Sequence, residues 1–286
     1  MGVYKHFLFG VDESEASLRA VQLGLGLAEP NTRFTAVSVA PAYEGDLGLV
    51  GISDVQQQLR QPCDEALARV ADLFAAAGQT VRTICALGEP YVRLVELAEA
   101  EGCDLIVVGA KGMSALHQVL LGSVARRVIG LSSQDVLVVP ETARNGWQKI
   151  LLATDLSPAS EAAENRALEV AAAHNSALTI LSVLELPSCL FGEAGALGCT
   201  LPPDQSSRLA ELQGVAADMG LKAEVLTGAG DAPQIICETA AQKGAEIIVL
   251  GSHGHSGLKR LLLGSTAEKV IGLAPCPVLV VKPTQT

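Results

Sequence analysis

The sequence predicts an α/β fold built twice, as two tandem open parallel sheets of five strands, each with helices on both faces. Short runs of Val, Ile and Leu alternate with longer amphipathic stretches, the pattern of repeated strand–helix units. Aromatic residues make up only 3% of the 286 residues, against 49% hydrophobic residues in total. That composition suits buried parallel strands covered by helices. An internal repeat, described next, sets the number of domains.

The repeat is clearest in two glycine-rich segments. Residues 105–123 read LIVVGAKGMSALHQVLLGS and residues 247–265 read IIVLGSHGHSGLKRLLLGS, and ten of the nineteen aligned positions are identical without a gap. The openings HFLFGVDESEAS and KILLATDLSPAS, which begin at His6 and Lys149, also correspond. We therefore expect two domains of one fold, residues 1–143 and 144–286.

Within each copy the apolar periodicity places the elements. In the first copy we expect strands at about 5–11, 34–39, 80–85, 104–108 and 136–139, and helices at 15–28, 55–77, 90–101 and 123–131. In the second copy, Ser157 followed by Pro158 predicts an N-cap and the first helical residue. Ligands of such sheets bind beyond the carboxyl ends of the strands.

The last strand of each copy reads VLVV, at 136–139 and 278–281. Each would leave an exposed apolar edge, which proteins avoid. We expect the two strands to pair, so that the chain forms an internal pseudo-dimer. Whether this unit dimerises further is left open.

Charge and cysteine usage narrow the classes of partner. The formal net charge is −11, which argues against nucleic acid and anionic membranes at long range but not against a nucleotide held by local N–H groups. The seven cysteines form no C-x-x-C pair and no apolar run is long enough to span a bilayer. We expect a reduced, cytoplasmic protein.

The glycine-rich segments carry the main functional signal. Each runs from a strand as G-x2-G-x9-G-S and leads into a helix. Glycines at a strand exit let the backbone approach a pyrophosphate, and a helix N-terminus supplies free N–H groups and a positive dipole end. The alternative is a glycine-rich turn with a serine N-cap and no ligand. The same spacing in both copies favours phosphate binding.

This signature, followed in the second copy by a helix and APCPVLVV, resembles the ATP-binding branch of the universal stress protein family. The resemblance covers nearly the whole chain, once in each half. It implies a fold like that of the adenine nucleotide alpha hydrolases, which is Rossmann-like, and ATP with Mg²⁺ as ligand. It also implies that tandem members pair their two copies internally.

Site residues follow from the resemblance, position by position. The aspartates that end the first strands, Asp12 and Asp155, would lie beside the ribose, the phosphates or their metal. Thr154 precedes Asp155 in the same cleft. Base or ribose contacts are implied for Val39, Val108, Val183 and Leu250. Phosphate contacts are implied for Gly109, Gly112, Gly122, Ser123, Val124, Gly251, Gly254, Gly264, Ser265 and Thr266.

The aspartates have a simpler alternative as helix N-caps, and the valines as plain core. The copies also differ, since the second keeps Thr154, GSHG and APCP where the first has Val11, GAKG and SSQD. The second copy is therefore the better candidate for binding. His253, His255, Cys189 and Cys199 match no standard zinc spacing, which favours solvent-exposed histidines, and any metal role of these residues is left open.

Three functions fit these features. The first is an ATP-binding regulator of a stress response that acts through an unidentified protein partner. The second is a slow Mg-dependent ATPase or nucleotidyl-transfer enzyme, for which only Asp12 or Asp155 could supply a base or metal ligand. The third is a scaffold that has lost nucleotide binding. We expect the first, with no catalytic residue assigned.

Overall fold

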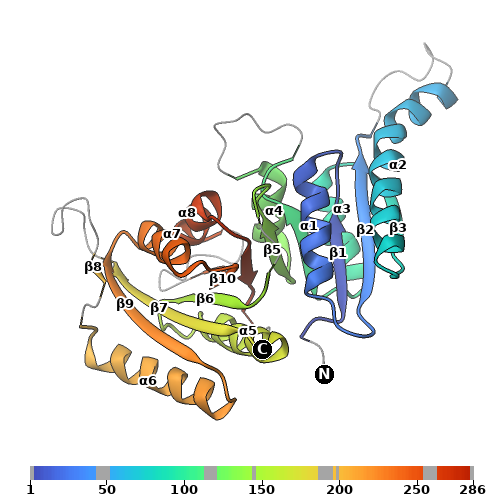
Figure 1. Cartoon of the computed structure of the whole chain (residues 1–286). Helices are drawn as coiled ribbons and strands as arrows, with labels where there is room; N and C mark the ends of the chain where they lie inside the picture. The colour runs from blue at the N-terminus through green and yellow to red at the C-terminus, as the bar shows by residue number, and fades with distance from the viewer. Residues whose placement is uncertain are drawn as a thin grey trace. The chain divides into compact units, whose positions relative to one another are not determined.

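A computed structural model of the chain describes residues 3–42, 52–112, 121–143, 146–185, 196–197, 200–253 and 263–283. The chain divides into two compact units, residues 2–141 and 142–286. We call them the N-terminal and C-terminal units. Each is an α/β layered structure (Figure 1), so the predicted fold class is confirmed.

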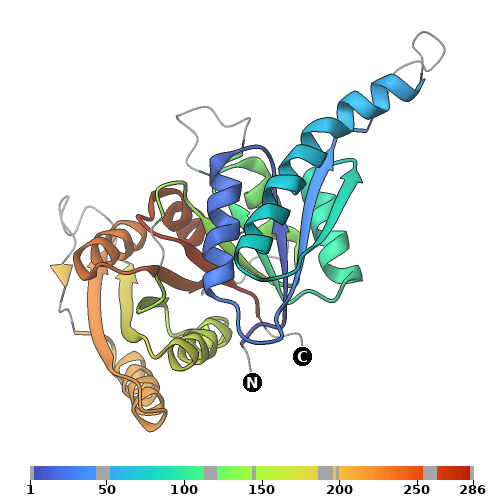
Figure 2. The same ribbon diagram turned by 45° about the vertical axis from the view of Figure 1, so that its right-hand side comes forward.

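The N-terminal unit is a parallel five-stranded sheet in the order β3-β2-β1-β4-β5. Helices α1 and α2 cover one face and α3 and α4 the other, as Figures 1 and 2 show. The elements are β1 (His6–Gly10), α1 (Glu15–Gly26), β2 (Arg33–Ala40), α2 (Ile52–Ala76), β3 (Arg82–Leu87), α3 (Pro90–Ala100), β4 (Leu105–Gly109), α4 (Ser123–Leu131) and β5 (Asp135–Val139).

The C-terminal unit repeats this arrangement, with the strand order β11-β10-β6-β7-β9-β8. Helices α5 and α6 lie on one face of the sheet and α7 and α8 on the other (Figure 1). The elements are β6 (Lys149–Thr154), α5 (Glu161–His174), β7 (Ala177–Glu185), β8 (Ala196–Leu197), α6 (Pro203–Asp218), β9 (Ala223–Gly230), α7 (Ala232–Lys243), β10 (Ile247–Gly251), α8 (Ser265–Leu273) and β11 (Val278–Val281).

Strand β8 is an addition that the sequence did not predict. It consists of two residues, Ala196 and Leu197, that pair antiparallel with β9. Two residues are too few for an apolar alternation to be visible. The other five strands of this sheet are parallel, as predicted.

The two cores are filled differently. In the N-terminal unit the rings of Phe7, Phe9, Phe34 and Phe74 form a buried cluster with neighbouring centroids 5.0–6.2 Å apart. The aligned positions of the C-terminal unit hold Ile150, Leu152, Leu178 and Ala216, all buried. Nearly all of the chain's few phenylalanines therefore serve one core.

One cysteine expectation is wrong. Cys63 of α2 and Cys85 of β3 form a disulfide, with their Cα atoms 6.0 Å apart, a usual separation for a disulfide. The expectation of a fully reduced chain relied on sequence spacing. It failed because a parallel sheet brings a helix and a strand together across 22 residues of sequence. Among the described residues, Cys103, Cys237 and Cys276 are free thiols.

No helix in the described parts of the chain is both long enough and apolar enough to span a membrane.

Candidate functional site

A cavity of about 390 Å³ opens at the carboxyl ends of β1, β2 and β4 in the N-terminal unit. We call it the N-terminal pocket. All eight residues that the sequence assigned to this copy line it: Asp12, Val39, Val108, Gly109, Gly112, Gly122, Ser123 and Val124. The structure thus brings the predicted set together, while the role of these residues in binding stays a prediction.

The equivalent cavity of the C-terminal unit, the C-terminal pocket, measures about 470 Å³. Its lining includes eight of the nine predicted residues: Thr154, Asp155, Val183, Leu250, Gly251, Gly264, Ser265 and Thr266. Gly254, the ninth, lies outside the described residues, as do His255, Cys189 and Cys199.

Each glycine-rich loop is closed by a backbone hydrogen bond. The Gly122 N–H donates to the carbonyl of Ala110 at 2.8 Å, and the Gly264 N–H donates to the carbonyl of Ser252 at 3.0 Å. These bonds fix the start of α4 and of α8 beside the strand that enters the loop. Both copies therefore present the same backbone concavity to their pockets.

The helices that begin in these loops have open N-termini. Gly122 and Gly264 are the N-cap residues of α4 and α8, and neither described helix start has a side-chain capping bond. The first N–H groups of a helix have no partner within the helix, and together they form its positive dipole end. Each pocket is thus equipped to hold an anion.

Asp12 faces the glycine loop of the N-terminal unit. Its Oδ1 accepts the N–H of Ser14 at 3.0 Å and the Ser14 hydroxyl. A Cβ placed on Gly112 would lie 2.6 Å from Asp12 Oδ2, so a side chain there would require the carboxylate to move. The N-cap of α1 is Ser14, which removes the alternative of Asp12 as the cap.

Asp155 occupies the same place in the C-terminal unit, where its Oδ1 accepts the N–H of Ser157 at 3.1 Å. The predicted cap at Ser157 is wrong, because α5 begins at Glu161 with Ser160 as its N-cap. The Ser160 N–H donates to the Ser157 carbonyl at 3.0 Å, so these residues form a separate turn before the helix. Asp155 is therefore not the cap either.

The turn after β6 is strained in a way that the turn after β1 is not. Leu156 has a φ of 60°, the left-handed region that residues other than glycine seldom adopt. Its N–H donates to Thr154 Oγ1 at 2.9 Å. Such outliers persist only where the surroundings hold them, and they are common at functional sites.

Sequence reasoning missed several wall residues. Ser17 and Ser160 line the two pockets, and their shared place at the end of the aligned openings was a usable signal. Glu185 and Gln205 line the C-terminal pocket only, and the hydroxyl of Thr266 donates to Glu185 Oε1 at 3.0 Å. Nothing in the repeat marks these two, because the copies differ there.

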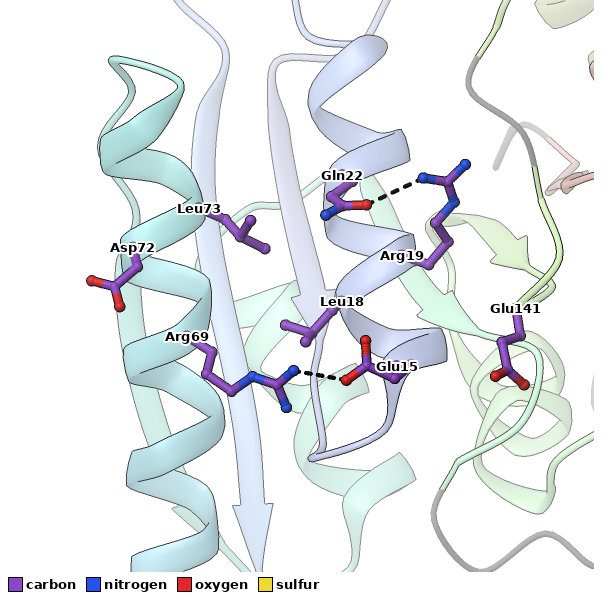
Figure 3. Close-up of a pocket in the computed structure, with 8 residues that line it drawn as sticks. All are labelled: Glu15, Leu18, Arg19, Gln22, Arg69, Asp72, Leu73 and Glu141. Atoms are coloured by element: carbon purple, nitrogen blue, oxygen red, sulfur yellow. Dashed lines mark hydrogen bonds and ion pairs between the residues drawn. The ribbon is translucent and has the colours of Figure 1, made fainter.

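A larger cavity, of about 560 Å³, lies between α1 and α2 of the N-terminal unit. The Arg69 guanidinium donates across it to Glu15 at 2.8 Å. Figure 3 shows this pair, and Arg19 donating to Gln22 on its own helix. None of the loop glycines lines it. Exposed ion pairs of this kind contribute little to stability. We assign no ligand to this groove.

The free thiols are unsuited to nucleophilic chemistry. Burial raises the pKa of Cys103 and of Cys276 to about 12, and that of Cys237 to about 11, so each stays a thiol near neutral pH. In the described parts of the chain no three His, Cys, Asp or Glu side chains gather closely enough to hold a metal ion by themselves.

Together these features define a class of protein: a duplicated α/β domain with a glycine-lined pocket at the carboxyl edge of each parallel sheet. The model of the universal stress protein family matches residues 3–140 and again residues 146–282. The chain therefore belongs to the universal stress protein family, as a tandem member.

Individual relatives support the same family assignment. The chain is 29% identical to a universal stress protein of Mycolicibacterium smegmatis over 96% of both chains. The universal stress protein A homolog 1 of Coxiella burnetii is 32% identical over 47% of this chain and 96% of its own length. A solved universal stress protein of Archaeoglobus fulgidus shares the fold, with a TM-score of 0.75, 23% identity, and coverage of 99% of this chain and 98% of that chain.

Proposed function

We propose that the protein binds ATP with Mg²⁺ in the strand-end pockets and acts as a nucleotide-dependent regulator of a stress response. The observation that carries the proposal is the duplicated backbone concavity. In both units a glycine loop closes by one hydrogen bond onto the open N-terminus of a helix, with an aspartate facing the loop or in the equivalent place.

In the proposed complex the phosphates bind at the helix N-termini. Their charge is met by the first N–H groups of α4 or α8 and by the positive dipole end, with the hydroxyl of Ser123 or Ser265 alongside. These are local groups, so the net charge of −11 does not prevent binding. In the N-terminal pocket Lys111 adds a cation to the wall.

The base and the metal also fit. Val39 and Val108 give the N-terminal pocket an apolar wall, and Val183 and Leu250 do the same for the C-terminal pocket. Mg²⁺ is usually held by one or two carboxylates together with substrate phosphates. Asp12 and Asp155 each supply one such carboxylate, while the metal would lower the charge on the triphosphate.

A matched pair of substitutions tests the proposal. Ser123→Asp and Ser265→Asp place a carboxylate at the first residue of α4 and of α8, where both serines are exposed. A negative charge there suits the helix dipole but repels a phosphate. We expect each variant to fold normally and to lose one class of ATP site in calorimetric titration with Mg-ATP.

The double variant should bind no ATP. If it titrates like the wild type, the phosphates do not bind at the helix N-termini and the proposal is wrong. Following ADP release during the same titration separates a binding protein from an ATPase.

A further inference from the structure

The two units of the chain can be compared residue by residue beyond the glycine loops. Gly78 and Gly102 have a left-handed backbone, and so do Gly220 and Gly244, which lie 142 residues later. The same 142 residues separate Gly122 from Gly264. The same offset aligns Cys63 of α2 with Gln205 of α6, and Ala66 with Arg208. On the first helices, Val21 aligns with Glu164, since Asp12 aligns with Asp155.

Glu164 is a buried carboxylate of α5 next to the C-terminal pocket, with 2% of its surface exposed. The hydroxyls of Thr154 and Ser160 donate to its Oε1 at 2.7 and 2.9 Å. The guanidinium of Arg208 donates to its Oε2 at 3.1 Å. Both carboxylate oxygens are thus satisfied, as a buried charge requires.

This network joins three elements around the pocket. Thr154 ends β6 and holds the strained turn at Leu156, which follows Asp155. Ser160 lines the pocket itself. Arg208 comes from α6, so its bond to Glu164 ties α6 to α5 beside the pocket.

Gln205 stands one turn before Arg208 on α6, and residues three apart lie on the same side of a helix. It is half-buried and lines the C-terminal pocket. None of the described side chains of α2, residues 57–76, lines the N-terminal pocket, and Cys63, the counterpart of Gln205, is instead bonded to β3 through the disulfide. Among the described side chains of these two helices, only α6 therefore contributes a polar wall residue.

The place of Gln205 also indicates which part of a ligand it meets. Helix α6 packs against β9, the neighbour of β7 in the sheet. The N-terminus of α8 lies beside β10, the strand that ends at the loop residue Gly251. Gly251 of the glycine loop and Gln205 thus come from opposite sides of the pocket along the strand order, β10 on one side and the helix on β9 on the other. A carboxamide has both donors and an acceptor, which suits a ribose or a purine edge.

We propose that Gln205 contacts the nucleoside part of the nucleotide in the C-terminal pocket, and that Glu164 is the positioning residue that holds α6, through Arg208, so that this contact can form. The inference rests on the proposed function. It gives the C-terminal pocket a nucleoside contact that has no counterpart among the described side chains of α2.

The test uses the full chain carrying Ser123→Asp, so that only the C-terminal pocket binds. In this background ATP and inorganic tripolyphosphate are titrated against Gln205→Ala, Arg208→Gln and Glu164→Gln. We expect Gln205→Ala to weaken ATP about tenfold and to leave tripolyphosphate unchanged, because one hydrogen bond to a ligand is lost. Arg208→Gln should show the same selectivity, and Arg208→Lys should recover part of the ATP affinity.

Glu169→Gln breaks the exposed pair with Arg166 on the same helix and should change neither affinity. Gln205 is on the surface of α6, so its substitution tests the contact even if Glu164→Gln fails to fold. Equal losses for ATP and tripolyphosphate, or no loss with either, would overturn the inference while the proposed function stands. A parent chain that binds neither ligand would overturn both.

Discussion

The N-terminal and C-terminal pockets share their backbone but not their walls. Both have a closed glycine loop, an open helix N-terminus and an aspartate at the end of the first strand. Around this common part, the N-terminal pocket has Val11 and Lys111 where the C-terminal pocket has Thr154 and His253. Backbone groups suffice to hold phosphates, so the side chains around them are free to diverge between the two copies.

The units differ in the same way behind the pockets. The N-terminal unit is braced by a phenylalanine cluster and a disulfide, whereas the C-terminal unit has aliphatic side chains and an ion pair between the buried Glu164 and the partly exposed Arg208. One fold thus reaches stability by two routes, and each route should respond to a different perturbation.

The largest expected effect is on the aromatic cluster. Phe74→Ala removes a ring that is 1% exposed and that lies 5.0 Å from the Phe34 ring. We expect it to lower the free energy of unfolding of the N-terminal unit by about 3–5 kcal/mol. Hydrogen exchange resolved by residue should show lost protection in residues 2–141 only. Val215→Ala, at a position 47% exposed, serves as the control and should change little.

The disulfide should give the next effect. Cys63→Ala with Cys85→Ala frees a loop closed over 22 residues, which by chain entropy costs roughly 3 kcal/mol of stability. Denaturant unfolding of the wild type with and without reductant is the simplest measurement. The C-terminal unit should be indifferent to reductant, and equal unfolding of the N-terminal unit in both conditions would show that the bond does not brace it.

A smaller effect should separate the two pockets. Lys111→Ala removes a cation from the wall of the N-terminal pocket, and a hydrogen bond to a charged group contributes roughly 1.5–3 kcal/mol. We expect ATP affinity to fall about tenfold at the N-terminal pocket and to be unchanged at the C-terminal pocket. Titrating Lys111→Ala in the Ser265→Asp and Ser123→Asp backgrounds reads each pocket alone. A loss at both would mean that Lys111 acts on the whole protein.

The smallest expected effect is on the stability of the N-terminal unit at acid pH. Burial, and next the positive charge of Arg33, lower the pKa of His6 from 6.5, where its ring meets Thr35 Oγ1 at 2.9 Å and the Glu101 carbonyl at 3.1 Å. A lowered pKa means that the unfolded state takes up the proton more readily. The contribution of neutral His6 to the free energy of unfolding is therefore complete above pH 6.5, and it is lost as the pH falls through the pKa of His6 in the folded state.

The C-terminal unit has an exposed lysine, Lys149, at the aligned position. Mildly acid pH should therefore destabilise the N-terminal unit more than the C-terminal unit. Hydrogen exchange at neutral and at mildly acid pH measures this difference. His6→Gln should remove that part of the pH dependence, and an unchanged pH profile would exclude His6 as its source.

The fold and the common part of the site could be predicted because they depend on short, repeated patterns. Apolar runs gave the strands, and the repeated glycines placed the loops before α4 and α8. What escaped prediction depends on contacts between distant residues. The Cys63–Cys85 bond, the Glu164–Arg208 pair and the wall at Gln205 join elements that are 22 or more residues apart or occur in only one copy. The start of α5 was misplaced because a local turn competes with the helix at Ser157.

Binding of ATP by the duplicated concavity can be measured directly on protein purified without added nucleotide. The protein is denatured, and the released nucleotides are separated by chromatography and counted per chain. We predict ATP in at least stoichiometric amount, lost from the C-terminal pocket in Ser265→Asp. An empty protein that also takes up no added Mg-ATP would contradict the account, and the glycine loops would then be inherited architecture without a ligand.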